Sequence, residues 1–234
     1  DKTKMKKKII AMIPARIGSV RLKKKNLILI NNQPLIYYAI NAAKKSKIFD
    51  EIYLNSDDEI FRKIAKKYNI KFYLRDKKLG SSSTKSDDIV YDFFKKFECH
   101  TLVWVNSIAP LQTAKEISKV VKYFLKKKFN SLITTNKFKY HGITNNRPIN
   151  FKKNDKFAKT QDLDPIDLMV YSLMMWNSKS FIKAYEKKCG TILHGKVGYY
   201  TVDKLSGIIV KNKHDLHIVS SIINKKRKRI RYFS

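Results

Sequence analysis

The chain has 234 residues, of which 43% are hydrophobic and 12% are aromatic. This length and composition fit one α/β domain with a sizeable core, and they exclude an intrinsically disordered chain. The apolar runs fall well short of the roughly 20 residues that cross a bilayer, so we expect no membrane partner. The two cysteines, Cys99 and Cys189, have neither a CxxC spacing nor the number that a disulfide framework needs. We therefore expect a cytoplasmic protein.

The formal net charge of +32 raises the question of a nucleic acid partner. Most of the 51 basic residues are lysine, and they are spread along the chain among many Ile and Asn residues, all of which have AT-rich codons. Proteins that bind nucleic acid usually rely on the forked donors of arginine. Genome composition therefore explains the charge better than a nucleic acid interface does. We interpret the dense basic run 225–231 as a solvated terminus.

Apolar runs of strand length alternate with segments of helical period through the first half of the chain. Strands are predicted at 9–13, 51–55, 71–74, 101–105 and 131–135. Apolar positions three and four apart predict helices over 34–43, 60–68, 87–97 and 113–124. This alternation is typical of a mostly parallel sheet covered by helices.

The alternation breaks at 137–165, a polar stretch that contains two prolines and Gly142. A loop of this length is uncommon in a compact domain unless it has a function. The pattern then resumes, with strands predicted at 170–176, 197–202 and 208–210, a helix from Ser178 and a last helix ending at Ile223. We therefore predict one domain over 5–234, starting at Met5. Its fold would be Rossmann-like, a mostly parallel sheet with helices on both faces and a protruding arm at about 137–170.

Several local signals add detail. Pro34 is expected at the first position of a helix, where its missing N–H costs nothing. Thr113 and Glu116 have the spacing of a capping box at the start of another helix. Trp104 and Trp176 lie within apolar strands, so we expect both in the core rather than in a base-stacking surface.

The loop 15–26, directly after the first strand, is the main candidate for a binding site. In α/β sheets ligands bind beyond the carboxyl ends of the strands. Gly18 allows close approach of the backbone to a ligand, and Arg16, Arg21 and Lys25 can surround a triphosphate. The loop has neither the GxxxxGK of a Walker loop nor the GxGxxG of a dinucleotide fingerprint. On charge and glycine alone, a solvated basic loop explains it equally well.

At these residues the sequence closely resembles the acylneuraminate cytidylyltransferases, which make CMP-sialic acids and related CMP-activated keto-sugars. The family string Ile-Pro-Ala-Arg, Gly-Ser, Arg-Leu, Lys-Asn-Leu is found here at 13–16, 18–19, 21–22 and 25–27. The similarity extends along nearly the whole chain. Its further motifs are Asn55-Ser56-Asp57, Arg75 with the stretch 79–86, Asn106 with Pro110-Leu111, and Gln161-Asp162-Leu163-Asp164-Pro165.

The resemblance implies a role for each matching residue. Arg16, Arg21 and Lys25 would act in catalysis by gripping the phosphates of CTP. The other nucleotide-binding positions would be Ala15, Gly18, Ser19 and Asn26 in the loop, with Arg75 and Ser86 selecting cytosine. The acidic sugar would contact Asn106, Gln161 and Asp162. The resemblance also implies a homodimer formed through the arm, and Mg²⁺ as the cofactor.

The sequence departs from the family where that metal would bind. The family ends its last strand with an Asp-x-Asp pair, and the matching stretch 207–212 places Ile209 and Lys211 at those two positions. Hard Mg²⁺ prefers carboxylate oxygens, which neither residue has. An Asn-Gly near the family's sugar pocket is likewise replaced in the region 171–173. His214 and His217 lack a third ligand nearby in sequence, so we predict no protein-held metal there.

Three hypotheses follow from these residues. The first is a cytidylyltransferase that couples CTP to an acidic keto-sugar of the sialic, legionaminic or pseudaminic acid type, with release of pyrophosphate. The second is a nucleotide-binding paralogue whose catalysis is reduced or lost with the metal-binding pair. The third, a nucleic-acid-binding protein, rests on the net charge alone.

Overall fold

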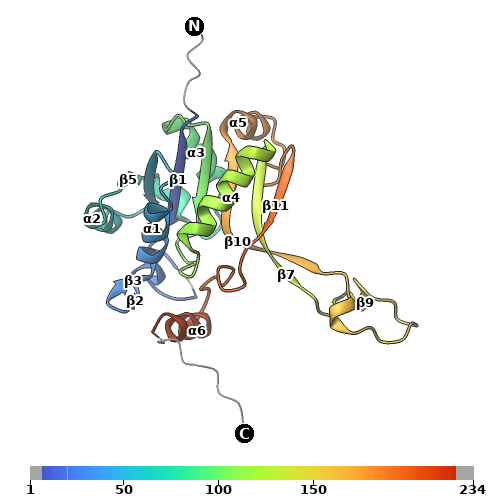
Figure 1. The fold of residues 1–234 in the computed structure, drawn as a ribbon. Helices are drawn as coiled ribbons and strands as arrows, with labels where there is room; N and C mark the ends of the chain where they lie inside the picture. Colours follow the sequence, from blue (N-terminus) through green and yellow to red (C-terminus); the bar gives the residue numbers. More distant parts are fainter. Residues whose placement is uncertain (1–6, 20, 225–234) are drawn as a thin grey trace.

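In the computed structural model, residues 7–19 and 21–224 are described, so Met5 and the basic run 225–231 lie outside them. Seven strands form one sheet at the centre of the molecule (Figure 1). Their order across the sheet is β11 (Val197–Thr201), β7 (Ser131–Phe138), β10 (Ile166–Asn177), β6 (Thr101–Val105), β1 (Ile9–Ala15), β4 (Glu51–Ser56) and β5 (Lys71–Leu74).

The sheet is mostly parallel, as predicted. Strand β1 pairs in parallel with β4 on one side and β6 on the other, and β5 and β11 also join their neighbours in parallel. Only β10 runs antiparallel, between β6 and β7. Every residue of β1 is buried, which is expected of a strand covered on both faces.

Helices cover both faces of this sheet (Figure 1). The helices are α1 (Leu35–Ser46), α2 (Ile60–Lys67), α3 (Ser86–Lys96), α4 (Ala114–Lys127), α5 (Ser178–Glu186) and α6 (Lys213–Asn224). Helices α1, α2 and α4 pack on the face to which Ala11 and Ile13 point, whereas α3 and α5 pack on the face of Ile10 and Met12. This division follows from the alternation of side chains along β1. Helix α6 packs separately, through Val219, in a third apolar cluster.

Two helix starts clarify the sequence signals. Pro34 precedes α1 instead of opening it: its φ of −63° and ψ of 146° make it the capping residue, and it also ends the short strand β3 (Gln33–Pro34), which pairs with β2 (Leu29–Ile30). Thr113 caps α4, because its hydroxyl accepts a hydrogen bond from the Glu116 amide at 3.3 Å. The Glu116 carboxylate accepts instead from the Asp203 amide at 2.7 Å, which joins α4 to the segment after β11.

The arm extends from the body as a continuation of β7 and β10 (Figure 1). Its tip holds the small hairpin β8 (Ile143–Thr144) and β9 (Arg147–Pro148), followed by the 3-10 helix η3 (Thr160–Asp162). Both long strands reach further into the arm than predicted, to Phe138 and from Ile166. The register of β10 shifts between Met169 and Met174, where Tyr171 takes a left-handed backbone with φ of 56°. This bulge separates the part of β10 in the arm from the part in the central sheet.

The strand predicted at 208–210 is wrong, because this segment is not part of the sheet. The Val210 amide donates to the Ile108 carbonyl at 2.9 Å, and the Val210 side chain is fully buried in the cluster with Leu22 and Leu35. The apolar residues therefore serve to pack a loop against the β1–α1 connection. Within the described residues, no helix combines the length and apolarity that spanning a membrane requires.

The N-cap of α4 gives a test of this architecture. Replacing Thr113 by Ala removes the acceptor for the Glu116 amide and should lower the free energy of unfolding by about 1 kcal/mol. Thr113→Ser keeps the hydroxyl and should change it little. Urea denaturation of both variants measures the difference, and equal losses in the two would contradict the capping role.

Candidate active site

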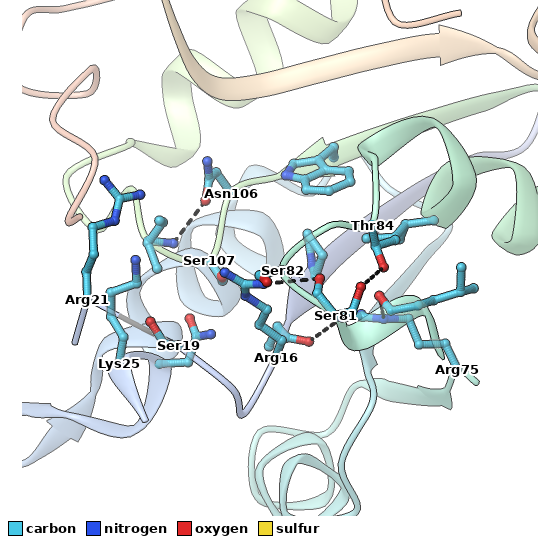
Figure 2. Close-up of a pocket in the computed structure, with 17 residues that line it drawn as sticks. Arg16, Ser19, Arg21, Lys25, Arg75, Ser81, Ser82, Thr84, Asn106 and Ser107 are labelled. Carbon is cyan, nitrogen blue, oxygen red and sulfur yellow. Dashed lines mark hydrogen bonds between the residues drawn. The ribbon is translucent and has the colours of Figure 1, made fainter. Parts of the chain in front are cut away.

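A cavity of about 330 Å³ opens at the carboxyl ends of β1 and β6 (Figure 2). These strands are neighbours in the sheet, but the chain continues from β1 to β4 on one side of the pair and from β6 to β7 on the other, and ligands bind at such switch points. The cavity is lined by residues of the loop after β1, of the segment before α3 and of the turn after β6. They are Pro14, Ala15, Arg16, Ser19, Arg21, Lys25, Asn26, Arg75, Leu79, Ser81, Ser82, Thr84, Ile89, Trp104, Asn106, Ser107 and Ile108.

The loop after β1 supplies the positive charge of this cavity. Arg16, Arg21 and Lys25 all line it, and Figure 2 shows Arg21 and Lys25 together at the left of the view and Arg16 nearer its centre, beside Ser81. Arg16 Nη1 donates to the Ser81 carbonyl at 3.2 Å, which connects the loop to the segment before α3. Lys25 begins the 3-10 helix η1 (Lys25–Leu27), after Lys24 in a left-handed conformation with φ of 49°. The turn thereby brings Lys25 back toward the arginines.

Burial and charge crowding lower the pKa of Lys25 from 10.5 to about 8. Desolvation is the largest cause, followed by the nearby charges of Arg21 and Arg16. Asp215, in the first turn of α6, opposes the shift, and Lys211 adds to it. The cavity is therefore a strongly positive environment, as expected of a site for a multiply charged anion.

Arg75 is 3% exposed and connects the segments that surround the cavity. Its Nη2 donates to the Ala15 carbonyl at 2.9 Å, its Nη1 to the Asn55 carbonyl at 2.7 Å, and its Nε to the Leu79 carbonyl at 3.3 Å. Burial lowers the pKa of Arg75, and Asp57, 3.9 Å from Nη2, partly compensates. Most N–H donors of the Arg75 side chain are therefore used in hydrogen bonds within the protein, chiefly at the ends of β1 and β4.

The carboxylate of Asp57 lies between the Arg75 guanidinium and the basic loop. Its Oδ1 accepts from the Ile17 amide at 3.3 Å, so it fixes the first turn of the basic loop. A Cβ on Gly80 would overlap this carboxylate, which explains a glycine at that position. Glycine there allows the 3-10 helix η2 (Lys77–Gly80) to lie directly against Asp57.

Asn106 stands at the turn after β6. Its Nδ2 donates to the Tyr171 carbonyl at 3.0 Å and its Oδ1 accepts from the Ile108 amide at 3.2 Å. Ser107, next in the chain, is buried and also lines the cavity. The bulge in β10 and the wall of the cavity are therefore connected through Asn106.

The structure also adds residues to which the sequence analysis assigned no individual role in the site. Trp176 is buried as expected, but Trp104 is only half-buried and lines the cavity. Its Nε1, like Oδ1 of Asn26, is buried without a hydrogen-bond partner among the described residues. The hydroxyl groups of the stretch before α3 and of the turn after β6 also line it: Ser81, Ser82, Thr84 and Ser107. Ser81, Ser82 and Thr84 fall in the stretch 79–86 already matched to the family, whereas Ser107 carries no signal that separates it from an ordinary loop residue.

Eight of the residues proposed from the sequence come together in this cavity: Ala15, Arg16, Ser19, Arg21, Lys25, Asn26, Arg75 and Asn106. Gly18 lies in the same loop with open space where a side chain would be, and Ser86 begins α3 just beyond the lining residues. Gln161 and Asp162 do not join them, because both are exposed in η3 on the arm.

The side chains that line the cavity do not fit a protein-held Mg²⁺ ion. None of the lining residues is acidic, whereas Mg²⁺ in proteins is bound through one or more carboxylates. Ile209 lies in the loop before α6 and Lys211 is exposed just after it. Across the described residues, no group of three His, Cys, Asp or Glu side chains is arranged to hold a metal ion.

Comparison with known proteins agrees with this arrangement. The family model described as cytidylyltransferase matches residues 10–205, so the chain belongs to the cytidylyltransferase family of nucleotidyltransferases. It is 25% identical over 185 residues to an N-acylneuraminate cytidylyltransferase of Streptococcus agalactiae, covering 75% of this chain and 45% of that protein. It is 30% identical over 168 residues to a pseudaminic acid cytidylyltransferase of Campylobacter jejuni, covering 67% of this chain and 72% of that protein. The expected resemblance is therefore confirmed.

The fold agrees with solved structures. A CMP:2-keto-3-deoxy-manno-octonic acid synthetase complexed with CTP superposes with a TM-score of 0.70 at 13% identity, covering 92% of this chain and 98% of that one. A 4-diphosphocytidyl-2C-methyl-D-erythritol synthase from Anaerococcus prevotii gives 0.66 at 15% identity, covering 94% and 97%. The matched part of this chain spans less than half of the streptococcal relative.

The bonds of Arg75 predict a loss of stability when its fork is removed. Arg75→Lys leaves at least two of the three carbonyls without a donor and should lower the free energy of unfolding by roughly 3 kcal/mol. Arg62→Lys, at an exposed arginine paired with Glu59, is the matched control and should be near neutral. Denaturant titration without ligand is the measurement. A variant as stable as the parent that has nevertheless lost affinity for CTP would argue for direct base contact instead.

The pKa of Lys25 predicts how anion binding depends on pH. Inorganic tripolyphosphate should bind more weakly as pH rises from 7.5 to 9.5, because the ammonium with its pKa near 8 loses its charge in the free protein. Lys25→Arg remains charged over this range, so its affinity should not fall. Isothermal titration calorimetry at fixed ionic strength gives both curves. Parallel curves for the two proteins would show that another group titrates.

Proposed function

We propose that this chain couples CTP to an acidic nine-carbon keto-sugar and releases pyrophosphate. The observation that carries the proposal is the cavity itself, where Arg16, Arg21 and Lys25 face a row of hydroxyl groups at the switch point of a cytidylyltransferase fold. The relatives named for N-acylneuraminate and pseudaminic acid support an acidic keto-sugar as the second substrate. Sialic, legionaminic and pseudaminic acids are all of this class.

In the proposed reaction, the anomeric hydroxyl oxygen of the sugar forms a bond to the α-phosphorus of CTP. The bond from that phosphorus to the bridging oxygen breaks on the opposite side, pyrophosphate leaves with the electron pair, and the hydroxyl proton passes to solvent. Catalysis then consists of alignment and stabilisation of charge on the phosphates. Arg16, Arg21 and Lys25 are placed to supply that charge as the bridging oxygen departs.

The remaining residues of the cavity would position the two substrates. Ser19 and the backbone at Ala15 and Gly18 would hold the loop against the phosphates, together with Asn26, whose Oδ1 has no partner in the described protein. Arg75 would act on the cytosine end mainly by fixing the carbonyls of Ala15 and Leu79, with Ser86 beside it. Asn106 would face the sugar from the turn after β6.

A homodimer would bring the arm into this scheme. Gln161 and Asp162 would reach the sugar from the arm of the second copy, since the arm that carries them extends away from the body of the molecule (Figure 1). The arm and its base expose large apolar side chains that such an interface would cover: Tyr140, Ile143, Ile149, Phe157, Leu168, Met169 and Tyr171. The cytoplasm, where CTP is available, would be the place of this reaction.

A second candidate function is nucleotide binding with little or no turnover. It is favoured by one observation, the absence of acidic side chains among the residues that line the cavity. A paralogue of this kind would bind CTP in the same loop. Calorimetry with CTP, run beside the turnover assay, separates the two functions.

The test is pyrophosphate release from CTP in the presence of a panel of nonulosonic acids. Release with at least one sugar is expected, and Arg21→Ala should reduce it by about a hundredfold because a charge on the transferred phosphates is lost. Arg62→Ala, at an exposed arginine on α2, is the control and should retain the rate. Binding of CTP without release under conditions where the Campylobacter relative turns over would favour the second candidate.

A further inference from the structure

The phosphate side of the cavity holds cations and no carboxylate. Arg16, Arg21 and Lys25 line it, and the charge of Lys211 adds to theirs at Lys25. These four positive side chains together match the charge of a free nucleoside triphosphate, which is about −4 above pH 7. In a partly desolvated site such interactions are stronger than in water.

Two acidic groups close to the cavity, Asp215 and Asp57, form hydrogen bonds within the fold. Asp215 accepts from the backbone amides of Lys211 and Asn212 at 2.7 and 3.1 Å, and therefore holds the segment before α6 in place. Asp57 accepts from the Ile17 amide and stands beside the buried Arg75. Both carboxylates are held by the fold, and neither lines the cavity.

The segment before α6 is fixed in place next to the basic loop. Val210 is buried with Leu22 and Leu35, and its amide donates to Ile108, a residue of the cavity wall. Lys211 follows directly and is exposed, so its ammonium is free to turn toward an anion in the cavity. The adjacent Ile209 offers no oxygen ligand.

From this arrangement we propose that the cavity binds its nucleoside triphosphate free of a divalent cation, with Lys211 joining Arg16, Arg21 and Lys25 in neutralising the phosphates. The proposal deepens the proposed function, since it rests on CTP being the ligand. It follows that Mg²⁺ competes with the protein for the phosphates: an ion already bound to CTP removes two charges that the four cations would otherwise meet.

Calorimetry with CTP in EDTA and in excess Mg²⁺ tests the proposal on the intact protein. The affinity in EDTA should equal or exceed the affinity in Mg²⁺. Binding at least tenfold weaker in EDTA would overturn the inference while leaving the proposed function in place. Lack of CTP binding under both conditions would overturn the proposed function as well.

Variants of Lys211 test its part in the site. Lys211→Met should weaken CTP binding in EDTA by roughly fivefold, as expected for loss of one charge-assisted contact. Lys213→Met removes an equal charge from an exposed position at the start of α6 and should have little effect. Equal losses in the two variants would show a general charge effect and contradict a specific role for Lys211.

A double variant reverses the chemistry of the segment. Ile209→Asp combined with Lys211→Asp supplies two carboxylates beside the phosphates, so CTP binding should become at least tenfold tighter in Mg²⁺ than in EDTA. Binding of Mn²⁺ in the presence of CTP, followed by electron paramagnetic resonance, gives a second readout. If the parent protein already shows this dependence on the metal, the inference is wrong.

Discussion

The cavity depends on the fork of one buried arginine. Strands β1 and β4 end side by side, and the carbonyls of Ala15 and Asn55 at these ends would lose their guanidinium donors if Arg75 were absent. Its guanidinium satisfies both and also reaches the Leu79 carbonyl of the next segment. A lysine cannot do this, because its single ammonium lacks the planar spread of donors. The shape of the nucleotide end of the site therefore follows from one side chain that a ligand need not touch.

Much of the fold could be predicted from periodicity. The apolar spacing identified the strands and helices around β1 because burial on both faces leaves a strong pattern in the sequence. The same reasoning failed at 208–210, where Val210 is apolar for packing against Leu22 rather than for a place in the sheet. An apolar pattern indicates which residues are buried, but it does not distinguish a buried strand from a loop that packs against an apolar cluster.

The site could be predicted only in part. The loop 15–26 was identified because it follows a predicted strand and matches the family string at several fixed spacings. The hydrogen bonds of Arg75 to the protein backbone could not be predicted. Its partners are carbonyls 20 and 60 residues away, and a carbonyl leaves no trace in the sequence. The hydroxyl of Ser107 was missed for a similar reason, because a single serine occurs in any loop. Hydrogen bonds between a side chain and a distant backbone carbonyl could be found only from the structure.

The bulge at Tyr171 has a mechanical consequence. Strand β10 passes from the arm into the central sheet without a break in the chain, and its one irregular residue is hydrogen-bonded through its carbonyl to Asn106 in the wall of the cavity. The irregular residue of the arm strand is therefore bonded directly to a residue that lines the cavity. A movement of the arm relative to the sheet would act on Asn106 through this hydrogen bond.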